Sequence, residues 1–336
     1  MTTLKEIAKR ANVSFQAVSA ALNNSGTSRI SPARKAEILK IAREMNYRPN
    51  RMASGLRKRS SSLIGIVPSS YNMYDIEIIN VIHARLQETP YSAILTVSNG
   101  SQGRNSTDKL LEQQTDGIIF LYTENKFNTE GIPCIFRSDE IVKNPSSDLV
   151  CVDFASAMDR ALSYLAALGH RKIAYIGPTH DVRYRTFIGH LSDYGLSTKE
   201  SWMYHHWGVH ETGRLGAAQI AENREDLPSA VICFNDSIAL GAMSEFQMRS
   251  IRIPGDISVI GFDDMPFSRY LYPPLTTFDT FIGKTGELLA DQLIRRIAVP
   301  LQALHTDLVT PSLTERGSCA PPEAVQSSSS AGRKKK

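Results

Sequence analysis

The chain has 336 residues, of which 42% are hydrophobic and 21% are charged, and its formal net charge at pH 7 is +4. This length and balance exclude a fibrous or disordered chain and predict two or three globular domains. Four cysteines lie far apart without a Cys-x-x-Cys pair, which argues against a zinc ribbon and a disulfide framework. No apolar run suits a signal peptide or a membrane span, so we expect a cytoplasmic protein without a membrane partner.

The charge is unevenly distributed along the chain. Residues 1–60 contain 13 Lys and Arg against three Glu, whereas residues 61–332 contain 21 basic and 31 acidic residues. The last four residues, Arg-Lys-Lys-Lys, add four positive charges. A surplus of ten positive charges on about sixty residues indicates a polyanionic partner, and nucleic acid is the commonest one. Charge alone leaves open a solvated basic face without a partner.

Three short helices are predicted within residues 1–48. Thr3 and Glu6 form a capping box that begins the first helix, Ser14 caps the second, and Ser31 before Pro32 caps the third. Apolar residues recur at helical spacing after each cap. Two helices joined by a tight turn and supported by a third form a helix-turn-helix, whose second helix enters the major groove of DNA. A plain helical interaction module is the alternative.

Residues 61–316 alternate apolar strands with longer helical patterns. We predict strands at residues 63–67, 92–97, 117–121, 134–136, 149–152, 172–176, 230–234 and 258–262, and helices at 155–168 and 236–248. Continuous apolar strands separated by helices predict parallel sheets that are covered on both faces. The pattern fits one large sheet or two lobes.

Polar residues follow several of these strands. Ligands of open parallel sheets bind outside the carboxyl ends of the strands, which marks residues 69–75, Asp153, Asn235 and Asp236. Asp236 also suits the N-terminus of the following helix, so a purely structural role stays open. His205, His206 and His210 are close in sequence, but nothing fixes their convergence, and we expect no metal. Dinucleotide, Walker, esterase and zincin motifs are absent, and we expect no cofactor and no catalysis.

Several long stretches of the sequence match a known pattern. The head contains Thr-Leu-Lys-Glu-Ile-Ala-Lys-Arg-Ala-Asn-Val-Ser at 3–14, Val-Ser at 18–19, Ala-Leu-Asn at 21–23 and Asn-Tyr-Arg-Pro-Asn at 46–50. The body contains Ala-Leu-Gly-His-Arg-Lys-Ile-Ala at 167–174, Phe-Asn-Asp at 234–236 and Ile-Ser-Val-Ile-Gly-Phe-Asp-Asp at 257–264. These motifs resemble those of the LacI/GalR family of bacterial transcription regulators, and the resemblance spans nearly the whole chain.

The resemblance implies a helix-turn-helix DNA-binding domain over 1–48 and, over 49–61, a hinge helix that forms on DNA. Leu56 sits at the position of the family's minor-groove wedge, which kinks the duplex. The implied DNA-binding residues are Thr3, Ser14, Phe15, Gln16, Ala17, Ser19, Ala20, Asn23, Arg29, Tyr47, Arg48, Asn50, Ala53, Leu56 and Arg57. The family usually has Thr at position 17 and often Arg at position 20, whereas alanine offers a base only apolar contact. Phe15 and Gln16 are therefore the best base-reading candidates.

For the body, the resemblance implies a two-lobed parallel-sheet sensor like the periplasmic sugar-binding proteins. The fold class is thus a small all-α helix-turn-helix head plus an α/β body. We expect the effector-binding and dimerisation core over 62–316, with an N-lobe of about 62–152 and 279–305 and a C-lobe of about 153–278 and 306–316. A disordered basic tail is expected over 317–336. The implied effector-binding residues are Asn72, Tyr74, Asp75, Asp153, Arg185, Trp207, Asn235 and Asp236, with Arg183 or Thr186 as alternatives to Arg185.

The residues at these positions predict the chemistry of the effector. The family's first ligand loop has two successive aromatic residues, whereas this chain has Tyr74 followed by Asp75, which disfavours a purine. A carboxylate, an arginine and Trp207 together suit a sugar, although Trp202 and Trp207 are also interpretable as core. We predict a repressor that binds a near-palindromic double-stranded DNA operator as a homodimer and responds to a small sugar. The alternatives are a sugar receptor without a transcriptional role and a regulator that senses a nucleobase or nucleoside.

Overall fold

A computed structural model describes residues 2–22, 30–47, 60–70, 72–96, 106–122, 131–207 and 209–323. Contacts divide the chain into two units, Met1–Ser61 and Ser62–Lys336. The predicted DNA-binding residues Asn23, Arg29, Arg48, Asn50, Ala53, Leu56 and Arg57, and with them most of the predicted hinge, lie outside the described residues.

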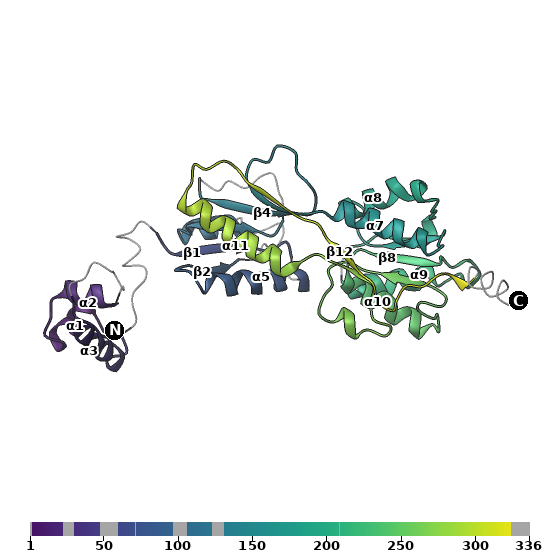
Figure 1. Cartoon of the computed structure of the whole chain (residues 1–336). Coiled ribbons are helices and arrows are strands. Elements are labelled where there is room, and N and C mark those ends of the chain that lie inside the picture. Colours follow the sequence, from purple (N-terminus) through teal and green to yellow (C-terminus); the bar gives the residue numbers. More distant parts are fainter. Residues whose placement is uncertain are drawn as a thin grey trace, which may run out of the picture. The chain divides into compact units, whose positions relative to one another are not determined.

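The described residues of the first unit form three helices: α1 (Leu4–Arg10), α2 (Phe15–Leu22) and α3 (Pro32–Glu44) (Figure 1). The predicted capping box is present, because the hydroxyl of Thr3 accepts a hydrogen bond from the Glu6 amide and the Glu6 carboxylate accepts one from the Thr3 amide. Ser14 accepts from the Ala17 amide at 3.1 Å, and Ser31 accepts from the Arg34 amide at 3.3 Å. All three predicted helix starts are confirmed.

A small apolar core joins the three helices. Ile7, Val18 and Ile38 contribute one fully buried side chain from each helix. The turn between α1 and α2 is held by Arg34 of α3, which donates to the carbonyl oxygens of Ala11 at 2.9 Å and Asn12 at 3.3 Å. The angle between the first two helices is thus fixed by the apolar core and by the hydrogen bonds of Arg34 from the third helix.

The first lobe of the second unit, the N-lobe, is built on a six-stranded parallel sheet with the order β11-β5-β4-β3-β1-β2. Its strands are β1 (Leu63–Val67), β2 (Ser92–Leu95), β3 (Gly117–Phe120), β4 (Cys134–Ser138), β5 (Asp148–Val152) and β11 (Thr306–Val309). Helices α5 (Met73–Leu86) and α11 (Ile282–Ala298) pack together over one face. Leu110 of α6 (Ser106–Glu112) packs in the smaller apolar cluster on the other face.

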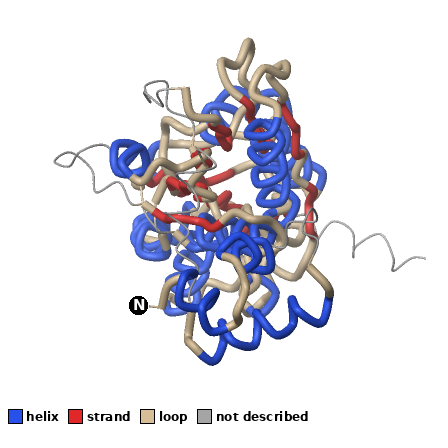
Figure 2. Tube along the Cα trace, turned by 90° about the vertical axis from the view of Figure 1, so that its left-hand side faces the viewer, coloured by secondary structure: helices blue, strands red, loops and turns tan. Residues whose placement is uncertain are grey.

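The C-lobe is built on a four-stranded parallel sheet with the order β7-β6-β8-β9. Its strands are β6 (Ile173–Ile176), β7 (Met203–Tyr204), β8 (Ala230–Cys233) and β9 (Ser258–Ile260). Helices α7 (Phe154–Ala167) and α8 (Val182–His190) pack with one apolar cluster, and α9 (His210–Ile220) and α10 (Asp236–Met248) with another. Short 3-10 helices occur at Leu191–Tyr194, Glu200–Trp202, Arg224–Asp226 and Ser268–Tyr270. Figure 2 shows the strands inside the molecule and the helices around them.

Helices α9 and α10 approach each other closely at two glycines. A Cβ atom on Gly241 would lie 1.8 Å from the carbonyl oxygen of His210, and one on Gly213 would lie 1.9 Å from that of Ile238. Any side chain at these positions would collide with the backbone of the neighbouring helix, so the crossing requires glycine.

In the described part of the body, three segments connect the lobes. The chain first crosses after β5, and the other two crossings form a small antiparallel ribbon of β10 (Thr277–Asp279) and β12 (Ser312–Thr314). We expected the last crossing near Thr306, but β11 pairs with β5 from Thr306 to Val309 and so belongs to the N-lobe. The crossing therefore follows Val309, because Thr306–Val309 adds an edge strand to the N-lobe sheet before the chain leaves.

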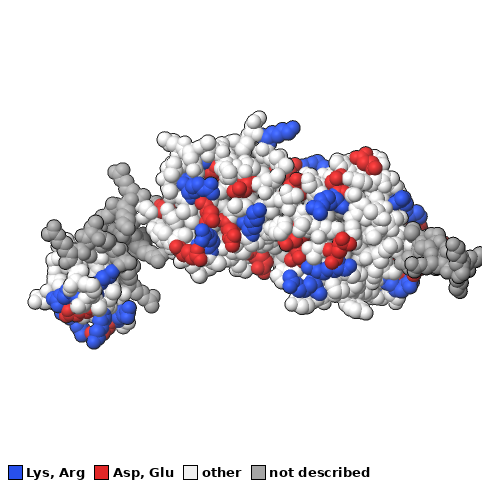
Figure 3. All heavy atoms as spheres, viewed as in Figure 1, with Lys and Arg blue, Asp and Glu red and all other residues white. Residues whose placement is uncertain are grey.

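Residues 317–323, the first part of the tail that we expected to be disordered, pack on the body. The Ser318 side chain is fully buried, accepts from the Thr276 amide at 2.8 Å and donates to the Val259 carbonyl at 2.6 Å. Residues 317–323 thus pack along the C-lobe, and residues 324–336 lie outside the described part of the chain. None of the helices in the described ranges is both long and apolar enough to cross a membrane. On the face of the body in Figure 3, basic and acidic side chains are interspersed.

Candidate functional site

A cavity of about 720 Å³ lies between the two lobes. The N-lobe contributes residues that follow β1, β3 and β4 or begin α5, namely Ser69, Ser70, Asn72, Tyr74, Asp75, Tyr122 and Asp139, together with Arg137 at the end of β4. The C-lobe contributes Phe154, Arg183, Trp207, Val209, Phe234, Asn235 and Asp263. The carboxyl ends of strands from both sheets therefore face one space, and its volume suits a small organic molecule.

The first loop of the N-lobe presents a buried carboxylate. Asn72 caps α5 by accepting from the Asp75 amide at 2.7 Å. One carboxylate oxygen of Asp75, Oδ2, accepts from the Ser69 amide at 2.9 Å, the Ser69 hydroxyl at 2.6 Å and the Ser70 amide at 3.0 Å. The other oxygen, Oδ1, has no hydrogen-bond partner among the described residues. Burial raises the pKa of Asp75, and nearby Arg137 opposes this shift.

Tyr74, next to this carboxylate, is 9% exposed, and its hydroxyl has no hydrogen-bond partner within the described ranges. Burial raises the pKa of Tyr74 to about 12, so the hydroxyl stays protonated. The guanidinium of Arg137 lies 5.1 Å from the centre of its ring. Tyr74 therefore lines the cavity with a ring that lies beside Arg137, and its hydroxyl is buried.

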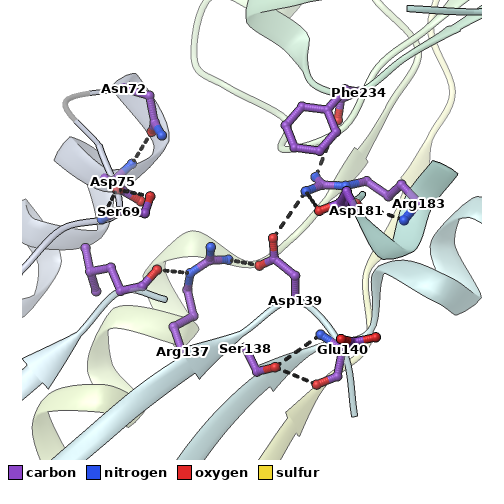
Figure 4. Close-up of polar contacts among 11 residues, drawn as sticks. Ser69, Asn72, Asp75, Arg137, Ser138, Asp139, Glu140, Asp181, Arg183 and Phe234 are labelled. Carbon is purple, nitrogen blue, oxygen red and sulfur yellow. Dashed lines mark hydrogen bonds and ion pairs between the residues drawn. The ribbon is translucent and has the colours of Figure 1, made fainter. Parts of the chain in front are cut away.

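Asp139 lies between two arginines, one from each lobe (Figure 4). Its carboxylate is 2.6 Å from Nη1 of Arg137 and 3.2 Å from Nη2 of Arg183. Arg137 also donates from Nε to the Leu121 carbonyl at 3.1 Å. This row of charges connects the end of β4 in the N-lobe to α8 in the C-lobe across the cavity.

Arg183 is held from several sides. Its Nε and Nη2 donate to the two carboxylate oxygens of Asp181, at 2.7 and 3.0 Å. Its guanidinium carbon lies 3.9 Å from the ring centre of Phe154 and 3.6 Å from that of Phe234. Burial lowers the pKa of Arg183, but Asp181 outweighs this effect and raises it overall. Arg183 is therefore permanently charged and fixed in orientation.

The C-lobe side of the cavity has an aromatic wall. Trp207 is 56% exposed and makes an edge contact with Phe234, with 5.9 Å between ring centres. Asn235 caps α10 by accepting from the Ile238 amide at 2.9 Å. Trp202, by contrast, is buried in the C-lobe and donates to the Asp226 carbonyl. Of the two tryptophans, only Trp207 lines the cavity.

Asp263 is the acidic residue that the C-lobe adds to the cavity. It is 6% exposed, and its φ of 110° is a conformation that side-chain-bearing residues rarely adopt. The Asp263 amide donates to the Phe278 carbonyl at 2.8 Å, which fixes the backbone. No described residue forms a hydrogen bond or ion pair with its carboxyl group. Burial and nearby Asp236 raise the pKa of Asp263 well above its ordinary value.

The structure corrects three of the predicted effector contacts. Arg185 lies outside the cavity, pairs with Glu140 and donates to the His180 carbonyl, whereas Arg183, one of the two alternatives, lines the cavity. Both residues are in α8, but positions two apart on a helix point to different sides. Asp153 does not line the cavity either, because it caps α7 by accepting from the Ser156 amide and hydroxyl.

Asp236 is the third correction. It is completely buried beneath the cavity wall, where its carboxyl group accepts from the Met265 amide at 2.8 Å, the Ser268 hydroxyl at 2.6 Å and the Thr277 hydroxyl at 2.5 Å. These three hydrogen bonds occupy both oxygens of the Asp236 carboxyl group and connect α10 to the loop after β9 and to β10. The structural interpretation of Asp236 therefore holds, and its neighbour Asn235 faces the cavity instead.

Sequence reasoning missed most of the charged lining. Asp139 and Asp263 each follow a predicted strand, so the strand-end rule that marked Asn235 would have found them. Arg137 directly follows the predicted strand at 134–136, so the same rule would have found it too. The predicted residues Asn72, Tyr74, Asp75, Trp207 and Asn235 do meet in the cavity. Among the described residues, no group of His, Cys, Asp and Glu could hold a metal ion, and His205 instead contacts the Tyr184 ring.

In the head, the predicted DNA-contacting residues on α2 divide by exposure. Gln16 is exposed, whereas Phe15, Ala17, Ser19 and Ala20 are partly buried. Thr3 and Ser14 are exposed and act as helix caps. Tyr47 packs against the head core.

A helix-turn-helix head and a two-lobed α/β body with a polar cavity between its lobes define a ligand-responsive DNA-binding regulator. The model of bacterial regulatory proteins of the lacI family matches residues 3–50, and that of the periplasmic binding protein-like domain matches residues 162–319. The chain belongs to the LacI family, whose members are DNA-binding transcriptional repressors with an effector-binding domain and not enzymes.

Individual proteins support this membership. The HTH-type transcriptional repressor PurR of Mannheimia succiniciproducens is 30% identical over 332 residues, covering 95% of this chain and 98% of that protein. The ribose operon repressor of Haemophilus influenzae is 28% identical over 333 residues, with the same coverage. The crystal structure of the lac repressor dimer bound to operator and the anti-inducer ONPF has a TM-score of 0.82 and 25% identity, covering 95% of this chain and 99% of that one.

Proposed function

We propose that the cavity between the lobes binds a small sugar and that the bound sugar changes the affinity of the chain for its operator. The observation that carries this proposal is the composition of the lining, which combines carboxylates, guanidiniums and aromatic rings. Sugar hydroxyls form strong bonds with charged groups, and the apolar face of a sugar ring packs on an aromatic side chain such as Trp207. The likeness to a ribose operon repressor also supports a sugar.

The same residues suggest how a ligand acts on the lobes. Asp139 and Arg183 belong to different lobes and both line the cavity, so a ligand that bonds to them adds contacts across the opening. The lobe arrangement that makes more of these contacts gains population, by an amount equal to the ligand's difference in affinity for the two arrangements. In a homodimer, a change in lobe angle would alter the spacing of two heads on a near-palindromic site.

The DNA side of the proposal rests on the head. Gln16 is exposed on α2, where an amide can pair with adenine in the major groove. Leu56 would wedge into the minor groove at the centre of the site, so Leu56→Ala should reduce both operator affinity and DNA bending. Binding at wild-type affinity with wild-type bending would contradict the hinge.

The experiment combines two screens on the full-length protein. Operators are first selected from a random DNA pool, and sugars, nucleosides and nucleobases are tested by thermal shift. We expect a neutral or substituted sugar to raise the Tm and to change operator affinity by about 5- to 150-fold. Asn235→Ala should reduce the shift, and Arg185→Ala, outside the cavity, serves as the control.

Two other outcomes would replace the proposal. Stabilisation by a nucleoside or nucleobase alone would make the chain a regulator of that class. Stabilisation by a sugar without any selected operator would favour a sugar receptor without a transcriptional role.

A further inference from the structure

More acidic than basic side chains line the cavity. Asp75, Asp139 and Asp263 line it, against Arg137 and Arg183. Asp181 lies behind the wall and adds a fourth carboxylate next to Arg183. If all these groups were ionised, the surplus would be two negative charges in a space closed off from bulk water on several sides.

Both arginines are already engaged by acidic residues. Arg137 pairs with Asp139, and Arg183 pairs with Asp181 through two parallel hydrogen bonds and with Asp139 through a third. Bidentate pairs of this kind are among the strongest side-chain contacts. Two carboxyl groups, those of Asp75 and Asp263, therefore remain without a cation bonded to them.

These two carboxyl groups differ in their surroundings. Three donors from Ser69 and Ser70 converge on one oxygen of Asp75, and Arg137 is close enough to influence its pKa. Its other oxygen, Oδ1, is buried beside the cavity and has no hydrogen-bond partner among the described residues. Asp263 has no such donors; burial and the nearby carboxyl group of Asp236 raise its pKa, and Arg183 and Arg137 only partly oppose this shift. Asp263 is therefore the carboxyl group of the cavity whose ionised form has the least support from hydrogen-bond donors, and a bound cation would favour that form.

The backbone of Asp263 adds an independent observation. A φ of 110° at a residue with a side chain stores strain, and strained residues of this kind cluster at ligand-binding sites. The Phe278 carbonyl and the ribbon at Asp279 hold the residue in this conformation. The fold thus keeps an acidic side chain at the cavity although the backbone of this residue is strained.

We propose that the effector is an amino sugar, whose protonated amine binds the Asp263 carboxylate while a hydroxyl donates to Oδ1 of Asp75. This inference rests on the proposed sugar-sensing function and specifies its ligand class. A compact ammonium group supplies three donors and a positive charge that favours the ionised form of Asp263. Asp75 and Asp263 belong to opposite lobes, so such a ligand also draws the lobes together.

The test uses matched pairs of sugars that differ in one group. Isothermal titration of the full-length protein with D-glucosamine, D-galactosamine and D-mannosamine is compared with D-glucose, D-galactose and D-mannose. We expect at least one amine to bind about tenfold or more tightly than its parent sugar, because a charge-assisted bond replaces a neutral one. The N-acetyl derivatives, which lack the charge, should lose this advantage.

Two variants test which carboxylate binds the ammonium group of the ligand. Asp263→Asn keeps the size of the side chain, and asparagine tolerates positive φ, so the fold should persist. We expect this variant to bind the amine and its parent sugar with Kd values within about threefold of each other. Asp75→Asn should weaken both ligands alike and leave their ratio near that of the wild type. Circular dichroism and the thermal midpoint verify that both variants are folded.

The outcomes separate the two proposals. A parent sugar that binds as tightly as its amine, or a preference that survives in Asp263→Asn, overturns the inference. If a neutral sugar binds and changes operator affinity while no amine does, the sugar-sensing function stands and the amino-sugar class is wrong. If neither member of any pair binds, both proposals fail.

Discussion

The Asp139 carboxylate lies 3.2 Å from Nη2 of Arg183 and so joins the end of β4 in the N-lobe to α8 in the C-lobe. The next residue, Glu140, pairs with Arg185 two positions further along the same helix. Two consecutive acidic residues therefore face two arginines across the gap between the lobes. The inner pair lines the cavity, and the outer pair is exposed to solvent, which gives the two contacts different energies.

The inner arginine should be much more important for stability than the outer one. Arg183→Ala leaves the buried Asp181 without its partner, and breaking such a pair costs about 3–5 kcal/mol. In Arg185→Ala, the lost pair has half-exposed side chains on both sides, so the free energy of unfolding should barely change. Urea unfolding of the two variants measures this difference. Equal losses of stability would contradict the assigned burial.

The stability of the body should depend on pH through Asp236. Burial raises the pKa of Asp236 from 3.8 to about 7 in the folded state. Between these values the folded carboxyl group holds a proton that the unfolded chain has released, so the free energy of unfolding falls as pH rises from about 4 to 7. The fall amounts to about 4 kcal/mol for this shift.

Asp236→Asn is the control for this titration. Asparagine has the same shape and can satisfy the Met265 amide and the Ser268 and Thr277 hydroxyls, but it cannot ionise. Denaturation at pH 5 and at pH 8 should show a smaller loss of stability in the variant than in the wild type. Parallel pH profiles would show that this carboxyl group does not titrate as described.

The crossing of α9 and α10 should not tolerate a methyl group. In Gly241→Ala, the new Cβ would lie 1.8 Å from the His210 carbonyl oxygen, so the two helices must separate. We expect a loss of about 1–3 kcal/mol or more in the free energy of unfolding. Gly283→Ala in α11, where no atom lies within 4 Å of the added Cβ, should be neutral or slightly stabilising. Thermal denaturation of both variants checks the prediction.

Two residues should separate base recognition from phosphate binding. Gln16→Ala should relax base preference at one operator position, because a bidentate amide contact discriminates by about 1–3 kcal/mol. Arg57→Ala, outside the described residues, should weaken binding to all sequences alike and reduce the salt dependence by about one phosphate contact. Binding to operator variants at several salt concentrations measures both effects. Uniform weakening by both substitutions would contradict the assignment of Gln16.

Local signals in the sequence were enough to place most elements. Side-chain caps such as Ser14 and Ser31 define helix starts, and buried strands appear as unbroken apolar runs, because each signal involves neighbours in the chain. The strand-end rule also placed Asn72, Asp75 and Asn235 at the cavity.

The remaining errors concern side chains whose roles depend on distant partners. Asp153 and Asp236 follow strands just as Asn235 does, but one caps its own helix and the other is saturated by residues about 30 to 40 positions away. Arg183 and Arg185 are both arginines of α8, so the sequence does not distinguish them. Only the packing of α8 against Phe154 and Phe234 decides which one faces the cavity. Tertiary contacts determine which of these side chains face the cavity, and a local sequence pattern does not contain that information.

The last crossing of the chain has a consequence for synthesis on the ribosome. The N-lobe sheet is covered by α11 and completed by β11, both of which follow the four strands of the C-lobe sheet in sequence. Until those residues emerge, the apolar face over β3, β4 and β5 lacks its helix, while residues 317–320, which pack on β9, are also still missing. Residues 306–309 complete the N-lobe and residues 317–320 the C-lobe, so the nascent body must mature late and as one cooperative unit.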